Sequence, residues 1–159
     1  MRLTLWLAFV AVLSAQERQD KNPLVYRVDF TIRDAADSAA KAARRYSMLL
    51  EAGQPNASLR SGNRIPVTAG SNTQYYDVGV NIDCRLRENG DKVTVIGTVE
   101  VSAVTPATPA NTGGLPVIAS TKSSLLASVT PGKPAVLTSF EDPAAKSRFE
   151  VEVLAAPVK

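Results

Sequence analysis

Reactive side chains are few in this chain, and their absence restricts the chemistry that it can do. The 159 residues include no histidine and a single cysteine. A Ser-His-Asp or Cys-His relay therefore cannot form within one copy. Zinc sites built on histidine or on several cysteines, histidine-ligated haem and an internal disulfide are excluded for the same reason. Acidic and basic side chains are the main remaining candidates for catalysis or ion binding.

The acidic residues do not form a pattern that is typical of a catalytic or metal site. Asp77 and Asp83 lie on the polar face of one predicted strand. Six residues of strand separate them by about 20 Å, which is too far for a catalytic carboxylate pair. Two further acidic pairs lack the spacing of a calcium-binding loop: Asp34 with Asp37, and Glu141 with Asp142. We therefore expect no catalytic residue, no metal ligand and no cofactor.

Cys84, two arginines and a tyrosine are the other side chains with chemical potential. Cys84 lies on the apolar face of a predicted strand, where a cysteine acts as a small hydrophobic residue rather than as a reactive thiol. Arg60, Arg64 and Tyr75 are candidate exposed contacts for a protein partner. The arginines lack the interleaved aromatic residues of a nucleic-acid site, and the net charge of +3 is small. We expect no nucleic-acid partner.

The N-terminus has the residue order of a secretory signal peptide. Met1-Arg2 supplies positive charge, Leu3–Leu13 is apolar, and Ser14-Ala15 ends the run with small residues. The apolar run is about eleven residues, shorter than the roughly 20 that span a bilayer as a helix. We expect residues 1–15 to be a removed signal peptide and residues 16–23 to be a disordered lead. The protein would then be exported to the periplasm or the cell exterior, with outer-membrane association or a retained anchor as alternatives.

The elements that must position these side chains are β-strands, because apolar and polar residues alternate along most of the chain. The strongest run spans residues 76–86, and a second run spans residues 93–103. Asn89-Gly90 between them suits the positive φ angles of a two-residue hairpin turn. With Asn89 and Gly90 as the loop, Leu86 is expected to face Val93 across the hairpin.

Weaker alternation predicts further strands, with Pro66 favouring an edge position. These segments are residues 26–32, 46–50, 57–60, 64–68, 117–129, 135–140 and 149–153. The expected fold is an all-β antiparallel sandwich of about eight to nine strands. It forms a single domain over residues 24–156.

Two segments interrupt this alternation, and a third segment is a predicted turn. Residues 34–45 are rich in alanine, acidic first and basic last, which fits either a short helix with Asp34 as its N-cap or a loop insertion. Residues 104–116 are rich in threonine, proline and glycine, and we expect a flexible loop. Residues 130–133 place proline and glycine in the central positions of a type II turn.

Several short motifs occur along the chain in a fixed order. They are residues 59–67, 74–82, 89–91, 99–102 and 130–137. On these motifs, residues 57–142 resemble the C-terminal β-domain of secretins, the ring-forming outer-membrane channel proteins of type II and type III secretion and of type IV pili. The matching residues are expected to set turns and close approaches of the backbone. These residues are Gly62, Pro66, Asp77, Gly79, Asn89, Gly90, Ser102 and Gly132.

The chain also departs from the secretin pattern. Cys84-Arg85-Leu86 stands where secretins commonly have a proline, and Thr138-Ser139-Phe140 replaces the usual glycine-glycine-leucine. The stacked periplasmic domains that normally precede the β-domain have no room in 159 residues. We therefore expect a stand-alone secretin-like β-domain.

Three function classes remain open. The first is a non-catalytic exported module of the bacterial cell envelope, which contacts protein partners or further copies of itself through edge strands. The second is a subunit of an outer-membrane secretin-like ring channel, because strands of about a dozen residues can cross an outer membrane when tilted. Membrane insertion is not the favoured interpretation. The third is a carboxylate-dependent hydrolase, which would need two acidic groups within about 10 Å beside a cleft.

Overall fold

Eight antiparallel β-strands make up the part of the chain that the structure describes. This structure is a computed structural model that describes residues 24–34, 43–105, 116–142 and 147–158. The strands are β1 (Val25–Asp34), β2 (Arg44–Glu51), β3 (Ala57–Ala69), β4 (Asn72–Asn89), β5 (Lys92–Thr105), β6 (Val117–Val129), β7 (Ala135–Asp142) and β8 (Ser147–Pro157). They confirm the all-β fold that was predicted from the alternation.

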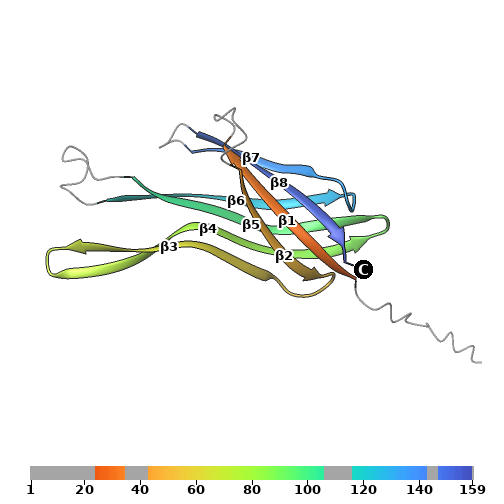
Figure 1. Ribbon diagram of the computed structural model, residues 1–159, viewed down its shortest axis with the longest axis horizontal. Helices are drawn as coiled ribbons and strands as arrows, with labels where there is room; N and C mark the ends of the chain where they lie inside the picture. Colours follow the sequence, from red (N-terminus) through yellow and green to blue (C-terminus); the bar gives the residue numbers. More distant parts are fainter. Residues whose placement is uncertain (1–23, 35–42, 106–115, 143–146, 159) are drawn as a thin grey trace, which may run out of the picture.

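The strands form two four-stranded sheets that lie face to face (Figure 1). The short sheet has the order β2-β1-β8-β7, and the long sheet has the order β3-β4-β5-β6. The short-sheet strands cross the long-sheet strands obliquely (Figure 1). The long strands continue past the short sheet at one end, so that the described strands of the short sheet cover only part of the long sheet (Figure 1).

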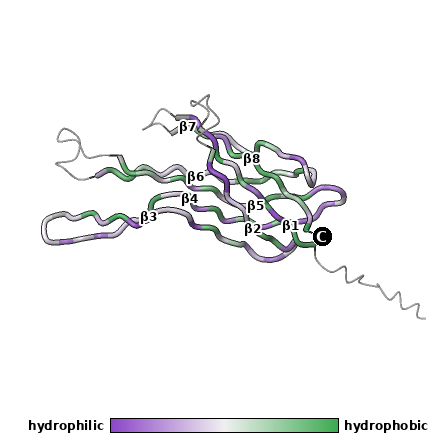
Figure 2. The backbone as a smooth tube through the Cα atoms, in the orientation of Figure 1, coloured by the Kyte–Doolittle hydropathy of each residue, from purple (hydrophilic) through white to green (hydrophobic). Residues whose placement is uncertain are grey.

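The core lies between the two sheets and is built from the alternating apolar residues. Figure 2 shows the alternation of hydrophobic and hydrophilic residues along the strands. The fully buried side chains come from both layers: Val28, Phe30, Val80, Ile82, Cys84, Leu86, Val93, Val95, Val99, Val151 and Val153. Burying one such side chain contributes about 1.5–3 kcal/mol. The predicted position of Cys84 on the buried face is confirmed.

Hydrogen bonds outside the strand ladders tie the two sheets together at one end of the sandwich. Gly53 donates its backbone N–H to the Leu86 carbonyl at 2.9 Å, and Gly132 donates to the Ala155 carbonyl at 2.8 Å.

The turn at residues 130–133 is confirmed, because Lys133 N–H bonds to the Thr130 carbonyl at 3.1 Å and Gly132 has a φ of 77°.

The predicted register of the long hairpin is wrong by two residues. Leu86 pairs with Val95 instead of Val93, and Asn89 pairs with Lys92. The turn residues are therefore Gly90, whose φ is 64°, and Asp91. A shift of two residues keeps every apolar side chain on the same face, so the alternation alone does not distinguish the two registers.

Two predicted boundaries are also corrected. The two short edge strands expected at residues 57–60 and 64–68 are one continuous strand, β3, although Pro66 does lie on an edge strand as predicted. Strand β1 extends further than expected and ends at Asp34, which pairs with Phe149; the segment for which Asp34 was the predicted N-cap lies outside the described residues.

Other predictions lie wholly or partly outside the described residues. The two ends of the alanine-rich segment 34–45 belong to strands: Asp34 to β1, and Arg44 and Arg45 to β2. Residues 35–42 between these strands are not described. The first two residues of the predicted flexible loop, Val104 and Thr105, belong to β5, and residues 106–115 are not described. The predicted signal peptide and the predicted N-terminal lead fall within residues 1–23, which are also outside the description.

Candidate functional site: a fork in the long sheet

The long sheet divides into two arms beyond Gly79. Strand β4 pairs with β3 from Asn72 to Cys84, but it pairs with β5 only from Val80 onward. Beyond that point β3 and β4 form one two-stranded arm, and β5 and β6 form another (Figure 1). We call the branch point, made by Gly62, Gly79 and Ser102, the fork.

Two facing glycines allow the backbones of β3 and β4 to approach closely at the fork. Gly62 and Gly79 are directly paired. A Cβ atom on Gly62 would collide with the Val78 carbonyl, and one on Gly79 would collide with the Ser61 carbonyl. Gly79 also has a φ of 144°, which L-residues rarely adopt. The sequence therefore needs glycine at both positions for the arm to leave the sheet in this way.

Ser102 closes the end of the β4–β5 ladder with its side chain. Its hydroxyl accepts a hydrogen bond from the Gly79 N–H at 3.0 Å and can donate to the Gly79 carbonyl at 3.4 Å. The residue is only 8% exposed although it lies on the polar face of β5. The hydroxyl thus satisfies backbone groups at the point where the strand ladder stops.

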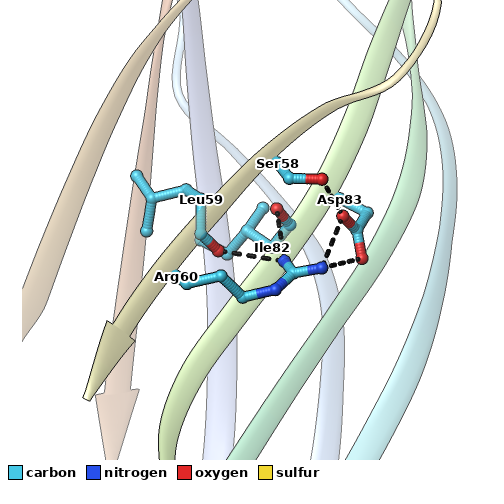
Figure 3. Close-up of polar contacts among 5 residues, drawn as sticks. All are labelled: Ser58, Leu59, Arg60, Ile82 and Asp83. Carbon is cyan, nitrogen blue, oxygen red and sulfur yellow. Dashed lines mark hydrogen bonds and ion pairs between the residues drawn. The ribbon is translucent and has the colours of Figure 1, made fainter. Parts of the chain in front are cut away.

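A salt-linked network joins β3 to β4 next to the fork (Figure 3). Arg60 Nη2 lies 3.0 and 3.1 Å from the two carboxylate oxygens of Asp83, and Ser58 donates its hydroxyl to the same carboxylate. Arg60 Nη1 also bonds to the Leu59 carbonyl at 3.2 Å and to the Ile82 carbonyl at 3.5 Å. The Ser58 hydrogen bond, and to a smaller extent Arg60, lower the pKa of Asp83. The lowered pKa favours the ionised carboxylate, and both of its oxygens accept hydrogen bonds from β3 side chains. Asp83 therefore links β4 to β3.

The β3–β4 arm carries a small exposed group of aromatic and charged side chains. The Arg64 guanidinium lies 5.4 Å from the centre of the Tyr75 ring, and its Nε atom lies 3.8 Å from Asp77 Oδ1. Tyr75 is 60% exposed and pairs with Pro66. A cation–π contact at such an exposed site contributes about 0.5–1 kcal/mol. The candidate contacts Arg64 and Tyr75 therefore lie together on this arm, whereas Arg60 is engaged beside the fork.

The described residues offer no arrangement that is typical of catalysis or metal binding. Cys84 is fully buried, and burial raises the pKa of its thiol to about 12. Two shallow depressions hold one acidic residue each, Asp83 in one and Glu141 in the other. Over the described ranges, no three histidine, cysteine or acidic side chains gather as metal ligands would. None of the described segments is a helix of the length and apolarity needed to cross a membrane.

Comparison with solved structures matches this fold to secretins. The secretin GspD of the ETEC pilotin–secretin complex has 17% identity and a TM-score of 0.52, over 74% of this chain and 28% of that chain. GspD of Escherichia coli K12 has 12% identity and a TM-score of 0.54, over 86% and 49%. The Salmonella SPI-1 injectisome secretin InvG has 10% identity and a TM-score of 0.55, over 85% and 62%.

The chain has the fold of a secretin β-domain. This confirms the resemblance that the sequence motifs predicted, and at these identities it concerns the fold alone. The chain spans between about a quarter and three fifths of the length of the three secretins. No protein-family model and no curated protein sequence matches it.

The motif residues of this secretin-like domain fall into separate groups. Gly62, Gly79 and Ser102 meet at the fork. Pro66 and Asp77 lie on the β3–β4 arm. The other three lie in or beside turns: Asn89, Gly90 and Gly132. Sequence reasoning treated each as structural on its own and did not predict that the first group meets. It also missed the Arg60–Asp83 pair, whose only signal was opposite charge on the polar faces of neighbouring strands.

Proposed function

We propose that this chain is a non-catalytic, exported module of the bacterial cell envelope that assembles with protein partners through the edge strands of its secretin-like β-domain. The observation that carries the proposal is the long sheet. Its edge strands, β3 and β6, are each 13 residues long and pair on one side only within the described chain. Free strand edges of this length are ready templates for pairing with another chain.

The solved structures with the same fold support protein partners as the relevant class of ligand. The ETEC structure is a complex of the secretin GspD with the pilotin AspS. The Klebsiella pneumoniae outer-membrane complex contains the secretin PulD together with PulS and a PulC domain. By analogy, we assign envelope proteins, including further copies of this chain, as the partners.

The state of the reactive groups supports a non-catalytic role. A carboxylate-dependent hydrolase would need two acidic groups beside a cleft. Asp83 is bound by Ser58 and Arg60 on the open face of the sheet, and its neighbouring depression contains no second acidic residue. Cys84, the single cysteine, is buried. The polar residues beside the fork therefore serve strand pairing.

A ring-channel subunit is the second candidate, and the strand order favours it. Four antiparallel strands place β3 and β6 in opposite directions at the two edges of the long sheet. Successive copies could therefore join β6 to β3 and keep the antiparallel alternation throughout. Direct membrane insertion is not favoured, because residues 72–77 at the tip of the β3–β4 arm are exposed and mostly polar.

Cell fractionation with native mass measurement tests the proposal. The full chain with a C-terminal tag is expressed in a Gram-negative host, and the periplasm and the carbonate-washed membranes are analysed on native gels. We expect a processed chain in the envelope fraction, released by carbonate and present in an assembly larger than a monomer. Carbonate-resistant rings in negative-stain images would favour the channel. A full-length chain in the cytosol, or an envelope chain that stays monomeric, would contradict the proposal.

A further inference from the structure

The outer face of the short sheet, which points away from the long sheet, carries an exposed apolar patch. Every second residue of β1, β2 and β8 lies on this face, because side chains alternate along a strand. Apolar side chains gather where β1 begins and β8 ends: Val25, Leu49, Leu154, Ala156 and Val158. Leu49 is 65% exposed, Val158 is 47% exposed and Val25 is 38% exposed. Adjoining exposed apolar side chains are typical of a contact surface rather than of a solvated one.

The strand registers make this apolar patch continuous. Leu49 of β2 and Ala156 of β8 are the two cross-strand partners of Arg27. Val158 follows β8 directly and donates its N–H to the Val25 carbonyl at 2.8 Å, which places it beside Val25. Direct cross-strand partners and residues two apart on one strand are neighbours at about 5–7 Å. The patch therefore reaches across three neighbouring strands, β2, β1 and β8.

Charged residues surround the patch, and several of them pair with one another. Arg27 Nε lies 3.1 Å from Asp29 Oδ2, and Arg33 Nη2 lies 2.9 Å from Glu152 Oε1. Ser47 donates its hydroxyl to Asp29 at 2.6 Å. An anionic membrane surface attracts clusters of unpaired basic residues, whereas this face carries a mixture of both signs. A protein surface with the same mixture of apolar and charged residues is the better match.

We propose that two copies of this chain pack together through the outer faces of their short sheets. The two-fold axis lies in the interface, perpendicular to the strands, and crosses β1 between Arg27 and Asp29. This inference goes beyond the proposed function, because it uses the face of a sheet and no strand edge. Two-fold contacts require a surface that complements itself, and they are the commonest contacts in soluble oligomers.

The size of the outer face is sufficient for such a contact. Four strands about 4.8 Å apart, with about eight residues each at 3.3 Å, form a face of roughly 19 by 26 Å. Two such faces bury about 1,000 Å² in total, which is the lower limit for a specific protein–protein interface. Face-to-face packing of sheets is also the arrangement between the two layers of the sandwich (Figure 1).

Charge selects the orientation of the axis. Arg27 and Ala156 are partners in one cross-strand row, and the next row on this face contains Asp29 and Leu154. The proposed axis exchanges these two rows. Arg27 then lies over Asp29 of the second copy, and in the same way Ala156 lies over Leu154. An axis parallel to the strands, between β1 and β8, would instead place Arg27 over Ala156 and bury a charged group against an apolar side chain, which is costly.

The neighbouring rows favour the same axis. Glu51 lies one row outside Arg27, and Arg45 lies one row outside Asp29. The axis therefore places Glu51 over Arg45 of the second copy, and the symmetry adds the reciprocal contact. Opposite charges that face each other across an interface fix the register of the two partners.

Exchanging the two charges at the axis tests the interface. The chain is expressed with its own N-terminus and a removable C-terminal tag, and it is purified without detergent. Arg27→Asp sets like charges over each other in a dimer, and Asp29→Arg does the same with the opposite sign. Each variant alone should be a monomer in light scattering at concentrations where the wild type is a dimer. An equal mixture of the two variants should form dimers again, because opposite charges then face each other at both positions.

A matched pair of leucine substitutions tests the apolar patch. Leu49→Lys places a charge on the patch, and Leu126→Lys places the same charge on the long sheet, where Leu126 is 77% exposed. Leu49→Lys should raise the dimer dissociation constant about 100-fold, because each dimer contains this side chain twice. Leu126→Lys should leave the constant unchanged. Circular dichroism identifies the variants that are folded, and Leu49→Lys decides the question if a charge variant is not.

The possible outcomes separate this interface from other occupants of the outer face. A wild-type chain that is monomeric, or that is recovered only with detergent or on phospholipid vesicles, overturns the inference. A dimer that withstands Leu49→Lys, or a mixture of Arg27→Asp and Asp29→Arg that stays monomeric, overturns it as well. None of these results contradicts the proposed function, because that proposal concerns assembly through strand edges in the envelope, which native gels of the envelope fraction measure independently.

Discussion

Ser102 lies on the polar face of its strand and is nevertheless buried, because its hydroxyl is held against the Gly79 backbone. Asp83 is likewise held by hydrogen bonds to the neighbouring strand, because Ser58 and Arg60 of β3 donate to its carboxylate. At the scale of single residues, polar side chains near the fork thus supply partners where the strand ladder stops or where β3 needs an additional link to β4. Their contributions can be measured one at a time.

Replacing Ser102 with alanine should destabilise the protein by about 1–3 kcal/mol. The loss follows because the Gly79 N–H and carbonyl would be left without this partner in a partly buried place. Urea unfolding measures the free energy of unfolding. Ser128→Ala, at an exposed position on β6, is the control and should change it by less than about 0.5 kcal/mol. Equal losses in both variants would show that the hydroxyl does not act through the fork.

Asp83 should contribute stability that is lost in acid. The fold lowers the pKa of this carboxyl, chiefly through Ser58, so folding favours the ionised form. The contribution is present above the unfolded pKa of about 3.9 and disappears as the pH falls through the lower folded value. The side chain is one-third exposed, so solvent screening keeps the effect small.

Urea midpoints measured across this acidic range test the assignment to Asp83. The urea midpoint of Asp83→Asn should fall less steeply with decreasing pH than that of the wild type. The midpoint of Asp77→Asn, on the exposed arm, should follow the wild type. An unchanged slope in Asp83→Asn would contradict the assignment.

At the scale of elements, the sequence predicted the strands and their buried faces but not all of their partners. The period-two alternation is sufficient to place Ile82 and Val99 on one face, as the structure confirms. It does not fix the register, because a two-residue shift preserves every face. It also did not reveal the fork. Tyr76 and Val78 continue the alternation past Gly79, yet β4 no longer pairs with β5 there.

The glycine that ends the β4–β5 pairing provides the test at this scale. Gly79→Ala should cost more stability than Gly70→Ala. Both residues have positive φ, but a Cβ at position 70 meets open space, whereas one at position 79 collides with the β3 backbone. The first substitution adds a backbone clash to a conformational cost of about 1–2 kcal/mol, and the second carries that conformational cost alone. Urea unfolding and hydrogen exchange of the β3–β4 arm amides measure the difference. Similar costs would indicate that the arm adapts without strain.

At the scale of the whole molecule, the two ends of the sandwich are built differently. At one end the sheets are joined by hydrogen bonds from Gly53 and Gly132 and by the Tyr26 hydroxyl, which donates to Glu88 Oε1 across the layers at 3.0 Å. At the other end the long sheet extends past the described strands of the short sheet and divides at the fork (Figure 1). The hydrogen bonds at the joined end thus hold the two layers together, while the arms of the long sheet extend beyond the short sheet.

Tyr26 should make the link between the sheets dependent on pH in the alkaline range. Burial, followed by the hydrogen bond and the charge of Glu88, raises the pKa of this phenol. Folding therefore favours the neutral form, and the contribution is present below the unfolded pKa of about 10 and is lost as the pH rises through the higher folded value. Tyr26→Phe should lose about 1–3 kcal/mol at neutral pH, because the phenol bonds to a charged acceptor.

The phenylalanine variant separates the hydroxyl link from the packing of the ring. Above pH 10 the wild type should approach the stability of Tyr26→Phe, since the ionised phenol no longer donates to Glu88. Tyr75→Phe, which changes an exposed ring on the arm, should follow the wild type at every pH. Urea midpoints over this range measure the difference in stability, and absorbance follows the ionisation of the phenol. If the gap between wild type and Tyr26→Phe stays constant with pH, the layers are held at that end by packing and backbone hydrogen bonds alone.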